Sequence, residues 1–371
     1  MRILGIETSC DETAAAVVQT TGDTTRPWRV LSSVIASQAD IHREWGGVVP
    51  EIASRQHVAD ICGVVEGALE QARIQASEID AVAVTHGPGL VGSLLVGVSF
   101  AKAFAAARDL PIVAVNHLAG HIESLVLEHG ELPLPAVVLV VSGGHTSLYF
   151  VPEPGRYRLV GQTRDDAAGE AYDKVAKMLG LGYPGGPLVD QLAAEGNDRA
   201  VMLPLPRFTH ADRNPSTTDA NPGEFSPAIR SMAEFSFSGL KSAAVRRIEK
   251  EGPGHIPDFC ASFQRVVVGT LVDRLFRVAE ALGARSVGIA GGVSANRRLR
   301  QDAAARGARE GLPVFVAALS LSTDNAAMIA AAGLRKMSIV GPSDLLFNAH
   351  ASLSIELADA HARRVIEEAR E

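Results

Sequence analysis

The feature that most constrains the fold of this chain is a pattern that occurs twice. An apolar strand is predicted at Ile3–Glu7, and a polar turn and a second strand at Ala14–Val18 follow it. In the second half, the apolar run Ala136–Val141, the turn 142–146 and a strand at Ser147–Val151 repeat that order. Short apolar runs bounded by polar turns are typical of strands. The sequence therefore predicts two copies of one unit.

A second pair of matching segments extends the duplication. A strand predicted at Ala81–Thr85 is followed by a glycine-containing turn and a helix over Val91–Ala107. A strand predicted at Ser286–Ala290 is followed by a Gly-Gly turn and a helix over Ser294–Arg306. Parallel strands separated by helices define an α/β fold. We therefore expect a duplicated α/β chain.

The domain boundaries follow from the repeat, and 371 residues suit two domains. We expect residues 1–133 to form the first domain, joined by the helix 323–337 and the C-terminal tail, which includes a helix at Leu357–Ala369. Residues 134–322 form the second domain. Within it, residues 197–232 contain five prolines among Asn, Thr and Asp, and are predicted to be an irregular insertion.

The composition excludes several classes of protein. A net charge of −7 gives no overall basic surface for nucleic acid, although a local patch or a partner subunit can supply one. Three widely spaced cysteines do not make a disulfide framework and fit a reducing compartment. The N-terminus lacks a signal pattern, and no apolar run approaches the roughly 18 residues of a membrane span. We therefore expect a cytoplasmic protein with no membrane partner.

Two histidines provide the first candidate site. His117 and His121 lie four residues apart, after the apolar run Leu110–Val115. In a helix, residues at this spacing lie on one face, so both imidazoles can bind one metal ion. Two histidines are only part of a site, because an open catalytic metal site has three protein ligands. On spacing alone, two polar residues at the start of a helix explain the pattern equally well.

A third ligand is available in Asp324, which directly precedes a helical run predicted over Asn325–Met337. Taken alone, Asp324 is explained better as the N-cap of that helix than as a metal ligand. In a two-fold repeat, however, equivalent elements converge on the cleft between the halves. That arrangement would bring Asp324 towards the histidine helix, and both interpretations stay open.

Glycine-rich turns provide the second candidate site. In the turn Ser142–Gly144, two glycines let the backbone approach a ligand, and successive backbone N–H groups bind anions such as phosphates. Gly-Gly turns between strands are also common without any ligand. Asp173, on a predicted helix, has a carboxylate suited to ribose hydroxyls. The turn Tyr183–Pro187 suits a flat base or sugar, and Gly291–Asn296 is a strand-to-helix junction near phosphate-binding geometry.

Nine segments in a fixed order carry a family resemblance. They are E-T-S-C-D-E-T (Glu7–Thr13), His42–His57, G-P-G-L (Gly87–Leu90), N-H-L-A-G-H (Asn116–His121), V-S-G-G-H-T (Val141–Thr146), Y-P-G-G-P (Tyr183–Pro187), F-S-F-S-G-L-K (Phe235–Lys241), A-G-G-V-S-A-N (Ala290–Asn296) and T-D-N-A-A-M-I-A (Thr323–Ala330). In this order they resemble the tRNA N6-adenosine threonylcarbamoyltransferase family of the bacterial TsaD type, formerly described as O-sialoglycoprotein endopeptidases. The sequence departs from the family in a longer loop at 198–232 and in the tail after Lys336.

The resemblance implies a duplicated fold of the actin, Hsp70 and sugar-kinase (ASKHA) type, with two domains around a nucleotide-binding cleft. It implies one divalent metal ion, Fe2+ in preference to Zn2+, held by His117, His121 and Asp324. It also implies a set of residues that bind an adenylate-containing substrate: Val140, Val141, Ser142, Gly143, Gly144, Asp173, Gly186, Asp190 and Asn296.

The activity that the resemblance implies is transfer of a threonylcarbamoyl group from threonylcarbamoyl-adenylate to N6 of the adenosine 3′ of the anticodon. The acceptors are tRNAs that read codons beginning with A. The implied partners are tRNA, a TsaB-like paralogous subunit and a TsaE-like small ATPase.

Asp11 and Glu12, on the first hairpin turn, are candidates for proton handling or substrate positioning, and the alternative is that they are only turn residues. Cys10 has no Lys, Arg or His near it in sequence, so an inert thiol is expected.

Leu118 stands where an H-E-x-x-H metalloprotease has its catalytic Glu, which excludes that class. An ATPase or a sugar-kinase-like phosphotransferase of the same fold is the enzymatic alternative, and it leaves the histidine pair unexplained. A non-catalytic scaffold is the third alternative.

Overall fold

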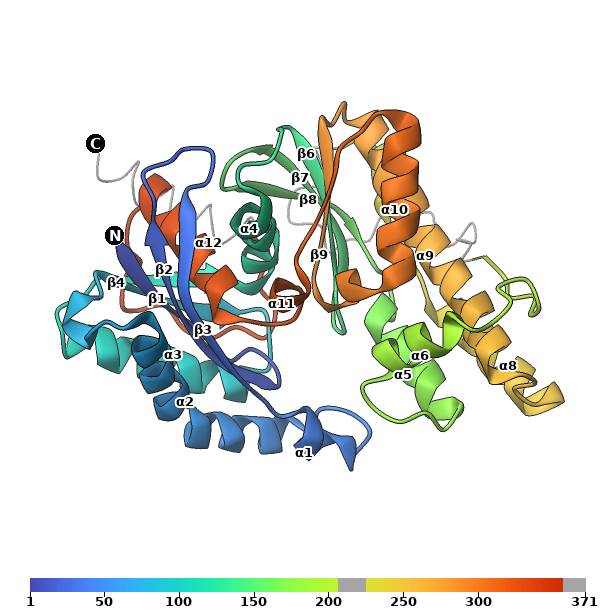
Figure 1. Cartoon of the computed structure of the whole chain (residues 1–371), viewed down its shortest axis with the longest axis horizontal. Coiled ribbons are helices and arrows are strands. Elements are labelled where there is room, and N and C mark those ends of the chain that lie inside the picture. The colour runs from blue at the N-terminus through green and yellow to red at the C-terminus, as the bar shows by residue number, and fades with distance from the viewer. Residues whose placement is uncertain (206–224, 356–371) are drawn as a thin grey trace. The chain divides into compact units, whose positions relative to one another are not determined.

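The computed structural model describes residues 1–205 and 225–355 (Figure 1). The chain divides into two compact units. Unit 1 comprises Met1–Leu132, Glu153–Tyr157 and the chain from Ala318, and unit 2 comprises Pro133–Pro152 and Arg158–Ala317. The chain therefore passes from one unit to the other at Pro133, Glu153, Arg158 and Ala318. The helix expected at Leu357–Ala369 lies outside the described residues.

Unit 1 is built on a five-stranded sheet in the order β3-β2-β1-β4-β5. β2 pairs antiparallel with β1 and β3, whereas β4 pairs parallel with β1 and β5. Every residue of β4 and β5 is buried, as expected for parallel strands covered on both faces. The strands are β1 (Arg2–Glu7), β2 (Glu12–Thr20), β3 (Trp28–Ser37), β4 (Ala81–Gly87) and β5 (Ile112–Asn116).

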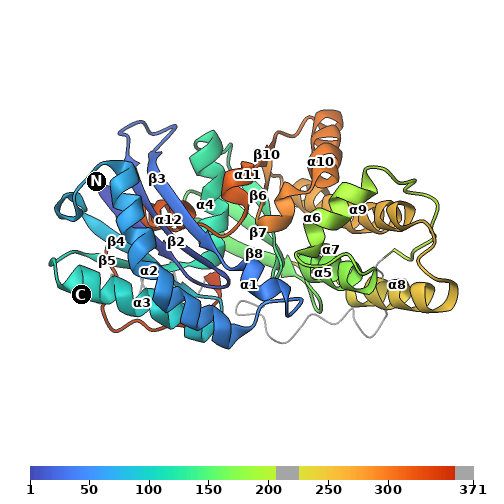
Figure 2. The same cartoon turned by 60° about the horizontal axis from the view of Figure 1, so that its bottom comes forward.

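Helices cover both faces of this sheet (Figures 1 and 2). Leu4 and Ile6 of β1 pack into one core with α2 and α3. Gly5 faces the opposite side, as alternate strand residues do, and lies against α12, where a Cβ would be 2.3 Å from the backbone oxygen of Ala326. The helices of unit 1 are α1 (Ala39–Arg43), α2 (Pro50–Ala72), α3 (Val91–Ala106), α4 (His117–His129), α11 (Leu319–Ser322) and α12 (Ala326–Ile339), with a 3-10 turn η1 (Ala76–Glu78).

Unit 2 repeats the topology of unit 1. Its sheet has the order β10-β9-β6-β7-β8, so β6 to β10 occupy the places of β1 to β5. β6 pairs antiparallel with β7 and parallel with β9, as β1 does with β2 and β4. The duplication predicted from the sequence is therefore confirmed. The strands are β6 (Ala136–Val141), β7 (Thr146–Glu153), β8 (Arg156–Gln162), β9 (Ser286–Ala290) and β10 (Val314–Val316).

The helices of unit 2 enclose one large apolar core with β6 and β9. None of the helices in residues 1–205 and 225–355 is long and apolar enough to cross a membrane. The helices are α5 (Ala168–Met178), α6 (Gly185–Ala193), α7 (Pro227–Ala233), α8 (Ser238–Glu251), α9 (Ile256–Ala281) and α10 (Arg297–Glu310), with a 3-10 turn η3 (Gly292–Ala295).

Three predictions for unit 2 need correction. The irregular insertion expected at 197–232 contains the helix α7, whose cap is Ser226 and whose Ile229 packs against the core, while residues 206–224 lie outside the described residues. The helix expected over Ser294–Arg306 is η3 followed by α10, because Asn296 is extended and caps α10. The sequence predicts a helical stretch over Ser242–Glu251, but α8 begins earlier, at Ser238.

Candidate active site

The histidine pair lies at the start of α4. Asn116 caps this helix, because its Oδ1 accepts a hydrogen bond from the backbone N–H of Leu118 at 2.9 Å. His117 and His121 lie one helical turn apart, and their ring centroids are 4.7 Å apart. Both imidazoles are buried. The helix thus brings the two predicted ligands together on one face, as the spacing indicates.

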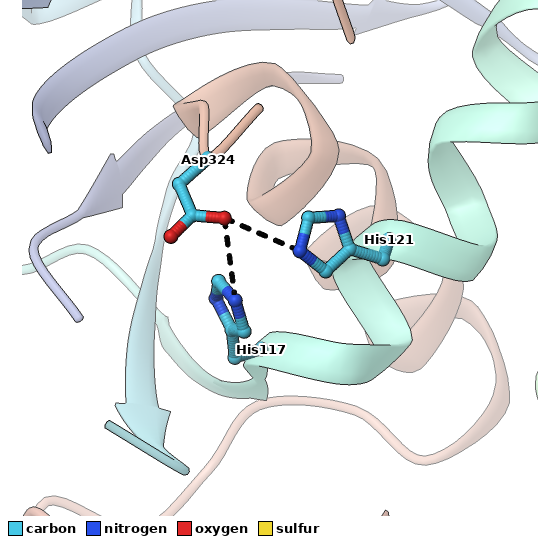
Figure 3. A group of neighbouring side chains, drawn as sticks. All are labelled: His117, His121 and Asp324. Carbon is cyan, nitrogen blue, oxygen red and sulfur yellow. Dashed lines mark ion pairs between the residues drawn. The ribbon is translucent and has the colours of Figure 1, made fainter. Parts of the chain in front are cut away.

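Asp324 reaches this pair because α12 packs closely against α4. Gly120, between the two histidines, permits the approach, since a Cβ there would lie 2.8 Å from Cδ1 of Ile329. Oδ1 of Asp324 lies 3.2 Å from Nε2 of His121 and 3.5 Å from Nε2 of His117 (Figure 3). The three candidate ligand atoms all lie within 4.8 Å of one another.

The N-cap interpretation of Asp324 was wrong. α12 begins at Ala326, and its cap is Asn325, whose Oδ1 accepts a hydrogen bond from the backbone N–H of Met328 at 3.0 Å. The same Asn325 amide donates to the backbone oxygen of Thr323 at 2.8 Å. The cap therefore fixes the turn from which the Asp324 side chain extends towards the histidines.

A buried carboxylate orients the first histidine. Oε2 of Glu7, at the end of β1, lies 2.9 Å from Nδ1 of His117 and accepts a hydrogen bond from the Thr85 hydroxyl at 2.8 Å. Oε1 of Glu7 accepts the backbone N–H of Ser9 at 2.5 Å, and Oγ of Ser9 lies 3.2 Å from Nδ1 of His117. A carboxylate on Nδ1 holds the tautomer whose Nε2 lone pair is available to a metal ion.

The second histidine supplies the test of whether a metal ion fits. His121 is fully buried, and among the described residues neither of its ring nitrogens has a hydrogen-bond partner, although Nε2 lies within ion-pair distance of Asp324. A buried polar atom without a partner carries a free-energy cost, which coordination to a cation would remove. Two imidazoles and one carboxylate are a donor set suited to Fe2+ or Zn2+, so the residues fit a divalent ion.

Burial opposes protonation of both imidazoles, yet their pKa values move apart. For His117, the carboxylates of Asp324 and Glu7 outweigh burial and raise the pKa to about 9. For His121, burial dominates and lowers the pKa. A ligating imidazole must be unprotonated, so a metal ion and a proton compete for His117.

The acidic turn between β1 and β2 lies near Asp324. Burial, followed by the charges of Asp324 and Asp11, raises the pKa of Glu12 well above its usual value. Burial and the same two carboxylates also raise the pKa of Cys10, which argues against a nucleophilic thiol. His57 holds the turn in place, since its Nε2 lies 3.0 Å from the backbone oxygen of Cys10. Cys10 and Glu12 therefore lie close enough to Asp324 to sense its charge, and Asp11 lies beside them.

In unit 2, the turn after β6 exposes two glycines. The backbone N–H of Ser142 donates to the oxygen of His145 at 2.8 Å and closes the turn. Around Gly143 and Gly144, no described heavy atom beyond their chain neighbours lies within 4 Å of a Cβ built at either position. Gly169 of α5 holds the turn in place, since its N–H donates a hydrogen bond to the backbone oxygen of Ser142 at 3.2 Å. The exposed backbone between Ser142 and His145 is therefore accessible to a ligand.

The polar residues predicted to bind the adenylate are connected through Gln264 of α9. Its Nε2 donates to Oδ1 of Asp190 at 3.1 Å, and its Oε1 accepts from Nδ2 of Asn296 at 2.7 Å. Asp173 accepts the N–H of Gly185 at 2.8 Å, directly beside Gly186. The polar residues predicted in unit 2 thus form two groups. Asp190 and Asn296 are joined by Gln264, and Asp173 lies beside Gly186.

Val140 and Val141 differ from the other predicted substrate residues. Both side chains are fully buried in β6, and Val141 belongs to the apolar core of unit 2. Any contact of these two residues with a substrate is therefore made by their backbone.

Sequence reasoning missed three residues that hold the candidate sites in place. Glu7 had a signal, because a carboxylate at the end of an otherwise apolar strand must find partners when it is buried. Asn116 had a weaker sequence signal, because asparagine is a preferred cap residue at the start of a helix. Gln264 had no sequence signal, since nothing distinguishes it from other single polar residues within a long helix.

Two sheets of one topology, each with a turn after its first strand that joins it to an antiparallel neighbour, define a duplicated fold of the actin-like ASKHA type. Full-length HypF, solved in its phosphate- and nucleotide-bound form, supports this class. Its TM-score is 0.55 at 13% identity, and the match covers 92% of this chain and 56% of that chain. At this identity the likeness shows the fold alone.

The sequence relatives identify the family. The family model of TsaD, tRNA N6-adenosine threonylcarbamoyltransferase, matches residues 29–331. A protein of that name from Syntrophomonas wolfei is 50% identical over 332 residues, covering 89% of this chain and 90% of the relative. One from Anaeromyxobacter dehalogenans is 50% identical over 337 residues, covering 90% and 93%. The chain belongs to the TsaD family and is an acyl-type transferase, as the resemblance predicts.

Proposed function

We propose that this chain transfers the threonylcarbamoyl group of threonylcarbamoyl-adenylate to N6 of the adenosine 3′ of the anticodon, in tRNAs that read codons beginning with A. The observation that carries the proposal is the family match over residues 29–331. The cluster of His117, His121 and Asp324 supports the proposal, because the activity of a sugar kinase or a simple ATPase does not explain this set of metal ligands.

The reaction balances without a protein nucleophile. The N6 amine attacks the carbamoyl carbon, a C–N bond forms, the bond from that carbon to the phosphate oxygen breaks, and AMP leaves with the electron pair. The amine loses one proton. The carboxylates of Asp11 and Glu12 are the groups we assign to accept it or to position the amine. Burial and the charge of Asp324 raise the pKa of Glu12, which makes its carboxylate a stronger base than an ordinary one.

We assign one divalent metal ion to Nε2 of His117, Nε2 of His121 and Oδ1 of Asp324, with Fe2+ preferred to Zn2+. When bound, the ion supplies a Lewis acid that can orient and polarise the threonylcarbamoyl group. Glu7 keeps the Nε2 lone pair of His117 available for it.

We assign the adenylate to unit 2. The backbone N–H groups around Gly143 and Gly144 bind its phosphate, since successive N–H groups form an anion-binding concavity. Val140, Val141 and Ser142 contribute through the same strand end. Asp173 and Asp190 accept hydrogen bonds from ribose hydroxyls, and Gly186 and Asn296 line the remaining surface.

The partners follow from charge as well as from the family. With a net charge of −7, the chain is expected to bind tRNA weakly by itself. We propose that a TsaB-like paralogous subunit and a TsaE-like small ATPase complete the active assembly in the cytoplasm.

The test supplies the full chain, both partner subunits, synthetic threonylcarbamoyl-adenylate and unmodified tRNA, and detects the modified nucleoside by mass spectrometry. His121→Ala is expected to lower kcat by about a hundred- to a thousand-fold, the usual cost of a lost charge-stabilising contact. Gly144→Val should raise the KM for the adenylate, because the side chain blocks the backbone approach.

Gly269→Val is the matched control for Gly144→Val, since Gly269 is an exposed glycine of α9 with equally open surroundings among the described residues. It should leave KM unchanged. If no modified nucleoside forms while ATP is hydrolysed at the same rate by the wild type and both site variants, the ATPase alternative replaces this proposal.

A further inference from the structure

The chain after α12 crosses the sheet of unit 1. We call residues Ser343–Leu353 the C-terminal strap. At its start, the N–H of Ser343 donates to the oxygen of Ile112 at 2.8 Å, and its Oγ accepts the N–H of Ala114 at 3.0 Å. Further on, the N–H of His350 donates to the oxygen of His86 at 2.8 Å. The strap therefore runs from β5 to the end of β4, next to the strand ends from which the candidate metal site is built.

The course of the strap is built into the sequence of β4. Gly87 ends this strand with a φ of 158°, and a Cβ on it would lie 2.5 Å from the backbone oxygen of His350. Any larger residue at this position would displace the strap. The close contact between Gly87 and His350 therefore depends on a glycine at the end of β4.

The first connection from the strap to the metal site passes through Asn116. While its Oδ1 caps α4, its Nδ2 donates to the backbone oxygen of Leu353 at 3.2 Å. Both ends of the amide are thus engaged, one by the helix and one by the strap. The strap bond fixes the orientation of the amide, and the amide fixes the first turn of the helix that carries His117.

The second connection passes through Gly89. Its N–H donates to the oxygen of Ala351 at 3.2 Å, and the next N–H, of Leu90, donates to the oxygen of Ser9 at 2.8 Å. Gly89 touches Ser9 closely, since a Cβ on it would lie 2.7 Å from the Ser9 oxygen. Oγ of Ser9 lies within hydrogen-bond distance of Nδ1 of His117, as does Oε2 of Glu7.

We propose that the C-terminal strap is a structural component of the metal centre, and that Asn116 is the positioning residue through which it acts. The strap supplies none of the three ligand atoms. It holds the helix cap and the Ser9 segment, and these two fix the position and the ring orientation of His117. The inference rests on the metal site assigned under the proposed function.

The test measures metal binding by the purified full chain, independently of the transfer reaction. Co2+ serves as a spectroscopic probe, and Zn2+ affinity is obtained by competition with a chelator. Asn116→Ala removes both bonds of the amide. Asn116→Ser retains a helix-capping hydroxyl that is too short to reach Leu353. Gly89→Ala forces Ser9 to shift.

All three variants are expected to lose metal affinity by about ten- to a hundred-fold, the usual cost of losing an outer-shell partner. The visible absorption of bound Co2+ should change in each, because the ligand geometry changes.

Two controls separate positioning from general destabilisation. Glu123→Gln breaks the buried ion pair with Arg335, which involves no residue of the strap, and Gly63→Ala adds a methyl group in open space on α2. Both should retain the wild-type affinity and spectrum, and thermal unfolding checks that every variant is folded.

Wild-type affinity and spectrum in both Asn116→Ser and Gly89→Ala would overturn the role of the strap while leaving the metal site intact. An equal loss in Glu123→Gln would overturn it as well, by showing that metal affinity follows the overall stability of the chain. A wild-type chain that binds no Co2+ or Zn2+ would refute the metal site itself and this inference with it.

Discussion

Replacing Glu7 with Gln tests how the metal site is organised, because it changes one buried charge and almost no volume. The carboxylate of Glu7 lies within hydrogen-bond distance of the backbone N–H of Ser9, the hydroxyl of Thr85 and Nδ1 of His117. A carboxylate accepts from all three groups, whereas a glutamine amide can accept at only one of its two ends.

The substitution is expected to act through the tautomer of His117. When the Gln amide donates to Nδ1, the ring proton moves to Nε2, which is the atom that lies 3.5 Å from Asp324 and that a metal ion requires. Loss of an outer-shell carboxylate typically lowers metal affinity by about ten- to a hundred-fold. That range corresponds to about 1.4 to 2.8 kcal/mol of binding free energy.

Glu123→Gln is the matched control for this experiment. Glu123 lies on the same helix as both histidines and is buried like Glu7, but its carboxylate pairs with Arg335 at 3.2 Å and accepts from the Tyr157 hydroxyl at 2.5 Å. Breaking this buried ion pair is expected to destabilise the chain by about 3 kcal/mol or more and to leave metal affinity unchanged.

The assay is Zn2+ binding in competition with a chelator, combined with chemical denaturation of each variant. Glu7→Gln should lose affinity, and Glu123→Gln should lose stability. The reasoning is refuted if Glu7→Gln binds Zn2+ as tightly as the wild type, or if both variants lose the same affinity in proportion to their loss of stability.

Three further predictions concern ligands, the insertion and pH. Asp324→Ala is expected to lose most bound metal while remaining folded, as measured by elemental analysis and circular dichroism; full retention of metal would contradict the ligand assignment. Replacing residues 207–224 with a short Gly/Ser linker should leave metal and adenylate binding intact, whereas a deletion that continues to residue 230 should destabilise unit 2, because Phe225 and Ile229 pack against its core. Burial, assisted by the charges of Lys336 and His350, lowers the pKa of His86 to about 4. Between about pH 4 and pH 6.5, His86 is therefore neutral in the folded chain but protonated in the unfolded chain. Stability should therefore fall as the pH drops from about 6.5 to 4, by up to about 3 kcal/mol, and His86→Gln should flatten this dependence in urea denaturation curves; an unchanged slope would refute it.

The duplicated fold could be predicted from the sequence because it depends on local patterns. β1 and β6 are apolar runs, and α2 repeats its buried residues every three to four positions from Ala53 to Ala68. β8 and β10 could not be predicted in this way, because their residues are mostly half-buried and β10 has only three residues. Such strands form because neighbouring strands offer hydrogen bonds, which a local pattern does not record.

The candidate metal site could be predicted only in part for a related reason. The spacing of His117 and His121 is local, so the sequence contains it. Asp324 lies about two hundred residues away, and both Asp324 and its neighbour Asn325 are good helix caps. Only packing of α12 on α4 decides which of the two side chains caps the helix and which faces the histidines. The C-terminal strap had no signal at all, since it binds the sheet mainly through its backbone.

The duplication also explains how one topology supports two kinds of candidate site. The last residue pair between β1 and β2 is Glu7–Ala14, and the last pair between β6 and β7 is Val141–Thr146. Residues 8–13 and residues 142–145 therefore lie between equivalent residue pairs. The first connection is two residues longer and carries carboxylates, which repel anions but sit well beside a bound cation. The second carries two glycines and no acid, and exposes backbone N–H groups suited to a phosphate. Because the strands are equivalent, the difference in chemistry comes from the length and the residues of the turn: the first places acidic side chains near Asp324, and the second exposes backbone N–H groups.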